Sequence, residues 1–136
     1  MIDRIKYKKI FKNIIFCTSN LNQDQKLAKI IKSKKIKFFK GDPVDVVDRI
    51  YRASIKEQLT HILYITADNP FFDFFYAKKV LGKLINSNFD LIRAFDLPYG
   101  AFCYGIKVSS LKKILEIKAI KESTNWERYY TETGLF

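Results

Sequence analysis

Two stretches of sequence decide the fold: FKGDPVDVVDR at residues 39–49 and ITADNP at residues 65–70. Each follows a short apolar run that is typical of a strand, and each leads into a helical pattern of apolar residues. A loop at the carboxyl end of a strand in an open α/β sheet is where such folds bind ligands. Two loops of this kind, carrying glycine, threonine, arginine and carboxylates, therefore indicate a nucleotide and metal site.

Strands and helices alternate outward from these two stretches. Strands are predicted at residues 13–18, 36–39, 61–66, 89–95 and 102–108. Helices are predicted at residues 1–12, 22–34, 44–57, 73–86 and 110–118, with Asp73 and Ser109 as the N-caps of the last two. This alternation of strands and helices predicts an α/β fold in which helices cover both faces of a mostly parallel sheet, a three-layer α/β/α arrangement. We expect one domain over residues 1–136.

The composition is that of a globular protein, with 48% hydrophobic and 29% charged residues. No apolar run approaches the roughly 20 residues needed to span a bilayer, and the N-terminus lacks the apolar segment of a secretory signal. Cys17 and Cys103 lie apart in strand-like runs, and His61 is the only histidine, which argues against a zinc site. We therefore expect a cytoplasmic protein with reduced cysteines and no membrane span.

The formal net charge of +11 is unevenly distributed. Residues 1–40 hold 12 Lys/Arg and 2 Asp/Glu, whereas the remaining 96 residues hold 13 and 12. Such a surplus can attract nucleic acid, an anionic membrane surface or a phosphorylated ligand. However, 20 of the 25 basic residues are lysine, whereas proteins that recognise nucleic-acid bases mainly use arginine. We favour a solvated lysine-rich face and do not expect a nucleic-acid partner.

Asp68 is the candidate metal ligand. It lies just past a predicted strand, between Thr66 and Pro70. A carboxylate in this place suits Mg²⁺, which takes one or two protein carboxylates and leaves its other positions to water and substrate phosphates. The structural alternative is that Asp68 closes an Asx-type turn ahead of Pro70. Taken alone, a single Asp-Asn-Pro sequence favours that alternative.

The segment from Gly41 to Arg49 is the second candidate region. Gly41 allows the backbone to turn sharply and to approach a ligand closely. Asp45 and Arg49 are four residues apart on one helical face, so an ion pair between them is expected. Either Asp45 orients Arg49 toward a nucleotide, or the segment is an ordinary capped helix. Two interpretations also apply to Thr18 and Ser19: they contact a base or ribose, or they form a polar strand end.

Taken in order, several segments resemble the middle of the cytidylyltransferases that activate acidic sugars, a family with acylneuraminate and spore-coat polysaccharide types. The segments are FCTS (16–19), KII (29–31), IKFFKG (36–41), DVVDRIYRA (45–53) and ITADNP (65–70). The spore-coat pattern is close to ATS…FRG…DVLDRYYxA…RITxDxP, and its spacing is matched throughout.

The resemblance implies a GT-A or Rossmann-like fold, incomplete relative to the full family, that transfers CMP from CTP to a sugar acid for surface polysaccharide biosynthesis. It implies Mg²⁺ as cofactor, with Asp68 as its carboxylate and as a catalytic residue together with Arg49. The residues implied near the nucleotide are Thr18, Ser19, Gly41, Asp45, Thr66 and Ala67.

The chain also departs from the family pattern. The family's glycine-rich triphosphate loop would precede Met1, and its late metal carboxylate would follow Phe136. Lys40 replaces the usual arginine before Gly41, and Tyr104 stands where an acidic residue is often found.

Two other hypotheses remain. The chain is a non-catalytic or degenerate member of the fold that acts as a binding or assembly module, completed by a second copy or another partner chain, because exposed strand edges invite pairing. Alternatively, residues 1–40 bind nucleic acid, which a steep loss of binding with salt would reveal.

Overall fold

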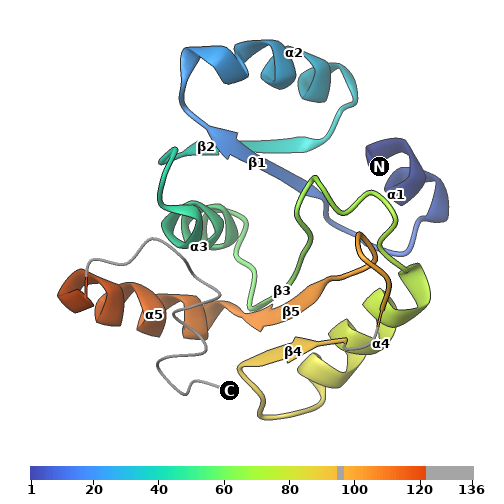
Figure 1. Cartoon of the computed structure of the whole chain (residues 1–136), viewed down its shortest axis with the longest axis vertical. Helices are drawn as coiled ribbons and strands as arrows, with labels where there is room; N and C mark the ends of the chain where they lie inside the picture. Colours follow the sequence, from blue (N-terminus) through green and yellow to red (C-terminus); the bar gives the residue numbers. More distant parts are fainter. Residues whose placement is uncertain (95–96, 122–136) are drawn as a thin grey trace. The chain divides into compact units, whose positions relative to one another are not determined.

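The computed structural model describes residues 1–94 and 97–121 (Figure 1). Contacts divide these residues into two compact units, and each is described by itself. The first unit comprises residues 1–12 and 60–110, and the second comprises residues 13–59 and 111–121. Residue 95, the last of a predicted strand, lies outside the described part.

The second unit contains a parallel strand pair with helices on both sides. Strands β1 (Ile15–Ser19) and β2 (Lys37–Gly41) run parallel. The turn η1 (Asn22–Asp24) and helix α2 (Gln25–Ser33) connect them, and helix α3 (Val46–Lys56) follows β2. In Figure 1, α2 and α3 lie on opposite sides of the strand pair. The core of this unit consists of apolar side chains from these helices and from α5: Ala28, Ile31, Val47, Ile50, Ala53, Leu111 and Ile114.

The first unit contains an antiparallel sheet packed against one helix. Its elements are α1 (Ile2–Lys8), β3 (His61–Tyr64), α4 (Phe74–Ile85), β4 (Leu91–Arg93), β5 (Tyr104–Lys107) and the start of α5 (Val108–Lys121). The strand order is β3-β5-β4, and α4 packs on all three strands. A side chain at Gly105 on β5 would place its Cβ 2.8 Å from Cγ1 of Val80, so this glycine allows the close approach of α4.

Of the two predicted N-caps, one is confirmed and the other is wrong. The Asp73 carboxylate accepts hydrogen bonds from the backbone N–H groups of Phe75 (2.7 Å) and Tyr76 (3.0 Å), which confirms the predicted cap. The prediction for Ser109 is wrong, because α5 begins at Val108. The chain passes directly from β5 into this helix, and the Val108 N–H donates to the Thr60 carbonyl at 2.9 Å, so this group is satisfied without a capping side chain.

The α/β class is confirmed, but the alternation of strands and helices did not predict that β5 pairs with both β3 and β4. Because β3 and β4 are both antiparallel to β5, they run in the same direction, as the α4 crossover predicts. Strand β5 instead follows a tight turn in which the Ala101 N–H donates to the Pro98 carbonyl at 3.0 Å and Gly100 has φ 82°. It then inserts between β3 and β4 and runs against both.

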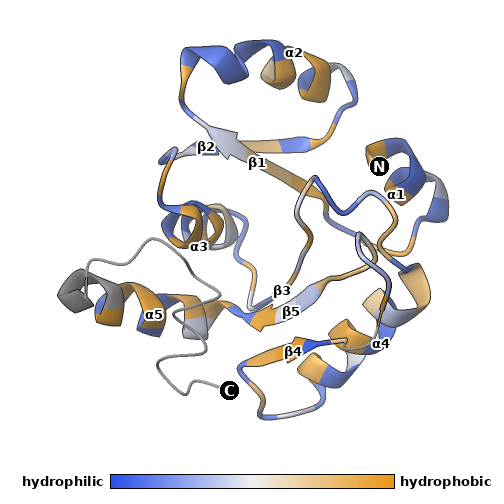
Figure 2. Ribbon diagram, in the orientation of Figure 1, coloured by the Kyte–Doolittle hydropathy of each residue, from blue (hydrophilic) through white to orange (hydrophobic). Residues whose placement is uncertain are grey.

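The lysine-rich surface that the charge predicted is found on and just after α2. Lys26, Lys29, Lys32 and Lys35 are all exposed there. Figure 2 shows hydrophilic residues predominating on α1 and α2 and hydrophobic ones prominent on α4. Within residues 1–94 and 97–121, no helix has the length and apolar character needed to cross a membrane.

Candidate functional site

The predicted site residues fall into two groups, one in each unit. Thr18, Ser19, Gly41, Asp45 and Arg49 belong to the second unit. The motif from Thr66 through Ala67 to Asp68 belongs to the first.

The parallel pairing of β1 and β2 brings Thr18, Ser19 and Gly41 to one edge. The register pairs Thr18 with Lys40 and Ser19 with Gly41, at the carboxyl ends of both strands. The Asn20 N–H then donates to the Gly41 carbonyl at 3.0 Å. Within this unit, three of the candidate residues therefore lie at one edge of the strand pair. We call Thr18, Ser19, Asp24, Gly41 and Arg49 the strand-end cluster.

Asp24 belongs to this cluster and was missed in the sequence. Its Oδ2 atom accepts hydrogen bonds from the Thr18 hydroxyl (3.0 Å), the Ser19 hydroxyl and the Ser19 backbone N–H (3.3 Å). The Ser19 and Thr18 hydrogen bonds, with a smaller contribution from the Arg49 charge, lower the pKa of Asp24. Asp24 is therefore a carboxylate at neutral pH. The sequence signal that could have identified Asp24 is an acidic residue a few positions after a strand that ends in Thr-Ser.

Gly41 makes room for Arg49. A Cβ at position 41 would lie 2.8 Å from Cγ and 3.1 Å from Cβ of Arg49, closer than side chains tolerate. The Arg49 Nη1 atom donates to the Asp42 carbonyl at 2.8 Å. Its Nε atom is buried and has no hydrogen-bond partner among the described residues. A buried donor without a partner is rare in folded proteins, and a ligand is one explanation for it.

Asp45 and Arg49 have partners other than those expected. Asp45 is the N-cap of α3, and its Oδ1 atom accepts from the Asp48 N–H at 2.9 Å. An N-cap residue has non-helical backbone angles, here φ −82° and ψ 89°, so its carboxylate turns back toward the first amides of the helix. The ion pair at i,i+4 spacing joins Asp48 and Arg52 instead, with Nε 2.8 and 2.7 Å from the two carboxylate oxygens.

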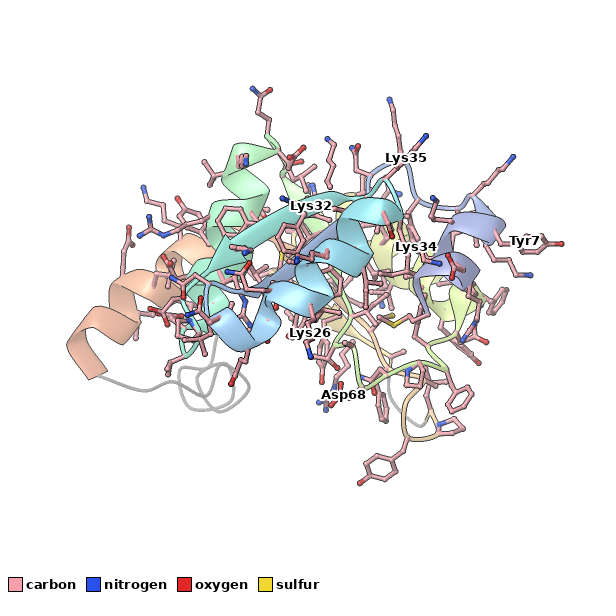
Figure 3. All side chains as sticks on the ribbon, turned by 90° about the horizontal axis from the view of Figure 1, so that it is seen from above. Tyr7, Lys26, Lys32, Lys34, Lys35 and Asp68 are labelled. Atoms are coloured by element: carbon pink, nitrogen blue, oxygen red, sulfur yellow. The ribbon has the colours of Figure 1, made fainter. Side chains whose placement is uncertain are left out.

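In the first unit, Asp68 lies on a tight turn after β3. The turn is closed by two hydrogen bonds from Asn69: its N–H donates to the Thr66 carbonyl (3.1 Å), and its side-chain amide donates to the Thr66 hydroxyl (2.7 Å). Ala67 and Asp68 are exposed, and Figure 3 labels Asp68 on this turn. Asn69 thus has the turn-closing role that the structural alternative gave to Asp68. Within the described ranges, the Asp68 carboxylate forms no hydrogen bond or ion pair.

The segment after Asp68 is held in place by Arg4 of α1. The guanidinium donates to the carbonyls of Pro70 and Phe72, the latter at 2.7 Å. It also lies 5.3 and 4.9 Å from the ring centroids of Phe72 and Phe74, within cation–π range. No local sequence pattern indicates this role of Arg4, because its partners are 66 and 68 positions away. The Asp68 turn is therefore followed by a fixed segment.

The donor set around Asp68 fits a metal ion that brings most of its ligands with it. The described part of the chain has no group of three His, Cys, Asp or Glu side chains that would enclose an ion. Mg²⁺ bound to substrate phosphates needs only one or two protein carboxylates. An exposed carboxylate that has no partner in the described part of the chain fits a Mg²⁺ that arrives with a nucleotide, and does not form a dedicated metal centre by itself.

Known proteins resemble this chain both in sequence and in structure. No family model matches the sequence. Over 100 residues the chain is 29% identical to an uncharacterized protein of Methanocaldococcus jannaschii, covering 74% of this chain and 41% of that protein. Its fold is similar to that of a cytidylyltransferase from Leptospira borgpetersenii serovar Hardjo-bovis, with a TM-score of 0.79 and 23% identity over 86% of this chain and 51% of that one. The chain thus spans about half the length of the proteins it matches. We conclude that it has the fold of this cytidylyltransferase.

Proposed function

We propose that the chain is the nucleotide-binding part of a cytidylyltransferase that transfers CMP from CTP to an acidic sugar. The similarity to a cytidylyltransferase structure carries this proposal. A shared fold does not establish a shared function. Further support comes from the positions of the family-like motifs, which end β1 and β2 in one unit and follow β3 in the other.

The proposed reaction is a displacement at phosphorus. A hydroxyl oxygen of the sugar acid attacks the α-phosphorus of CTP, and a new O–P bond forms. The bond from this phosphorus to the bridging oxygen breaks, pyrophosphate leaves with the electron pair, and the hydroxyl proton passes to solvent. Such a transfer requires mainly positioning and charge neutralisation, with no covalent enzyme intermediate.

Asp68 is proposed to hold Mg²⁺ on the nucleotide, where the ion would neutralise charge on the phosphates. Its carboxylate is exposed, has no partner among the described residues, and lies on a turn closed by other groups. Thr66 and Ala67 are proposed to contact the nucleotide beside it.

The strand-end cluster is proposed to bind the nucleoside part of CTP. Arg49 brings a positive charge to this edge, together with a buried Nε–H that has no partner among the described residues. Gly41 leaves the space that the Arg49 stem occupies. Because the Thr18 and Ser19 hydroxyls already donate to Asp24, they can only accept hydrogen bonds from a ligand.

Pyrophosphate release tests the proposal. The chain is incubated with CTP, Mg²⁺ and a panel of sugar acids, each beside the corresponding neutral sugar. Release should require Mg²⁺ and a sugar acid, and it should be lost in Asp68→Asn. Glu116→Gln, an exposed carboxylate on α5, is the matched control and should retain release. Equal release with neutral sugars would contradict the acidic-sugar substrate.

A binding or assembly module is the second candidate function. The first unit exposes several aromatic side chains, including Phe71, Phe75, Tyr76 and Tyr99, the last 97% exposed. Exposed apolar clusters often mark interaction surfaces. CTP binding without pyrophosphate release, together with dimers in sedimentation that Tyr99→Ser disrupts, would favour this function over catalysis.

A further inference from the structure

Among the described residues, hydrogen bonds reach only one oxygen of the Asp24 carboxylate. Oδ2 accepts from the Thr18 hydroxyl, the Ser19 hydroxyl and the Ser19 N–H. Oδ1 has no hydrogen-bond partner in the described part of the chain. A carboxylate oxygen has capacity for about two further hydrogen bonds. Asp24 is also partly exposed, so a ligand can reach it.

The neighbouring hydroxyls present only acceptor capacity. Each hydroxyl has one hydrogen, and both Thr18 and Ser19 direct theirs to Asp24. The Ser19 oxygen already accepts from the Leu21 N–H at 3.2 Å as well. Next to these acceptors, Arg49 is a pure donor whose charge helps to lower the pKa of Asp24. The cluster thus offers acceptors from Asp24 and its hydroxyls and a donor from Arg49.

Cytosine and uracil differ in the hydrogen bonds that such a cluster can form. Cytosine carries an exocyclic amino donor beside two acceptors, N3 and O2. Uracil carries the acceptor O4 where cytosine has the amino group. An aspartate pairs with the amino group of cytosine, whereas it repels the O4 of uracil.

We propose that Asp24 selects cytosine over uracil by accepting a hydrogen bond from the exocyclic amino group through Oδ1. This assignment rests on the proposed function, since it requires the strand-end cluster to bind the base of CTP. When UTP binds, this hydrogen bond to a charged group is lost and two acceptors face each other. CTP should therefore bind at least about tenfold more tightly than UTP.

Asp24→Asn tests this role with almost no change in shape. The amide oxygen of asparagine can replace Oδ2 and keep the three donors from Thr18 and Ser19. Its NH₂ group then takes the place of Oδ1 and donates a hydrogen bond. We expect CTP binding to weaken and UTP binding to strengthen, so that the ratio of the two dissociation constants changes by about tenfold or more.

Asp90→Asn is the matched control. Asp90 accepts a hydrogen bond from the buried Ser110 hydroxyl, so it is a similar hydroxyl–carboxylate contact in the other unit. This variant should leave the ratio of CTP to UTP affinity unchanged. Thermal melts show whether each variant is folded.

A second measurement uses the wild-type chain alone and is independent of variant folding. A CTP analogue with hydrogen in place of the amino group should bind at least about tenfold more weakly than CTP. Equal affinity for the analogue, or equal loss of CTP and UTP binding in folded Asp24→Asn, would overturn the role of Asp24 while leaving the proposed function intact. Absence of any nucleotide binding by the wild-type chain would overturn both.

Discussion

At the scale of single residues, Gly41 determines where Arg49 can lie. An alanine there would place its Cβ 2.8 Å from Cγ of Arg49, so the arginine would have to move. We expect Gly41→Ala to lower the free energy of unfolding by about 1–3 kcal/mol, as overpacking does. It should also weaken CTP binding. Urea unfolding and calorimetry measure the two effects.

Gly82 on α4 provides the control for this substitution. A Cβ at that position would meet nothing within 4 Å. Gly82→Ala should therefore raise the free energy of unfolding by about 0.5–1 kcal/mol, because alanine is a better helix former. Equal stability of the two alanine variants would contradict the close approach between Gly41 and Arg49.

The hydrogen bonds to Asp24 predict a pH dependence. Because they lower its pKa in the folded state, the stabilisation is complete above the unfolded-state pKa and is lost as the pH falls through the folded-state pKa. The melting temperatures of the wild type and Asp24→Asn should differ most near neutral pH, and this difference should shrink below about pH 4. A difference that stays constant down to pH 3 would show that the Asp24 charge does not stabilise the fold.

The sequence predicted that Thr18 and Ser19 end one strand and that Gly41 ends the next, and the parallel register brings these strand ends to one edge. It did not predict Asp24, whose role depends on how the loop after β1 folds back onto the strand end. The Asp45–Arg49 pair was expected from helical spacing, but Asp45 is the N-cap of α3 and does not have helical backbone angles. Helical spacing therefore predicts ion pairs only inside a helix, as for Asp48 and Arg52.

At the scale of elements, the two predicted N-caps can be compared directly. Asp73 caps α4 with two hydrogen bonds, whereas Ser109 is exposed inside the first turn of α5. Asp73→Ala should lower the free energy of unfolding by about 1 kcal/mol, and Ser109→Ala should change it by less than about 0.5 kcal/mol. Chemical denaturation measures both. A larger loss for Ser109→Ala would contradict the observed start of α5.

Helices were predicted better than strand pairings, for a physical reason. The apolar spacing of α3 and α4 is local, and their bounds lie within a few residues of the predicted ones. The place of β5 between β3 and β4 depends on contacts between segments far apart in the chain. No local pattern carries that information, so the sequence predicted five strands but not their order.

At the scale of the whole molecule, each unit contains one cysteine. Burial raises the pKa of the Cys17 thiol to about 11, although the nearby positive charge of Arg49 lowers it in part. Burial, with a smaller contribution from Asp73, raises the pKa of Cys103 to about 11. Both thiols should react slowly with alkylating reagents near pH 8, because the thiolate is the nucleophile.

Single-cysteine variants therefore report the unfolding of each unit. In Cys103→Ser only Cys17 of the second unit remains, and in Cys17→Ser only Cys103 of the first. If residues 1–136 form one domain, as the sequence predicts, the two thiols should become reactive at the same urea concentration. Separate midpoints would show that the units unfold independently and would contradict the single-domain prediction.

Calorimetric titration with CTP, with and without Mg²⁺, tests the proposed nucleotide site most directly. The wild-type chain should bind CTP in a Mg²⁺-dependent manner, and Asp68→Asn should lose that dependence while keeping its fold. The reason for this expectation is the Asp68 carboxylate, which is exposed on the turn after β3 and has no partner among residues 1–94 and 97–121. Failure of the wild-type chain to bind CTP, or unchanged Mg²⁺-dependent binding by Asp68→Asn, would contradict it.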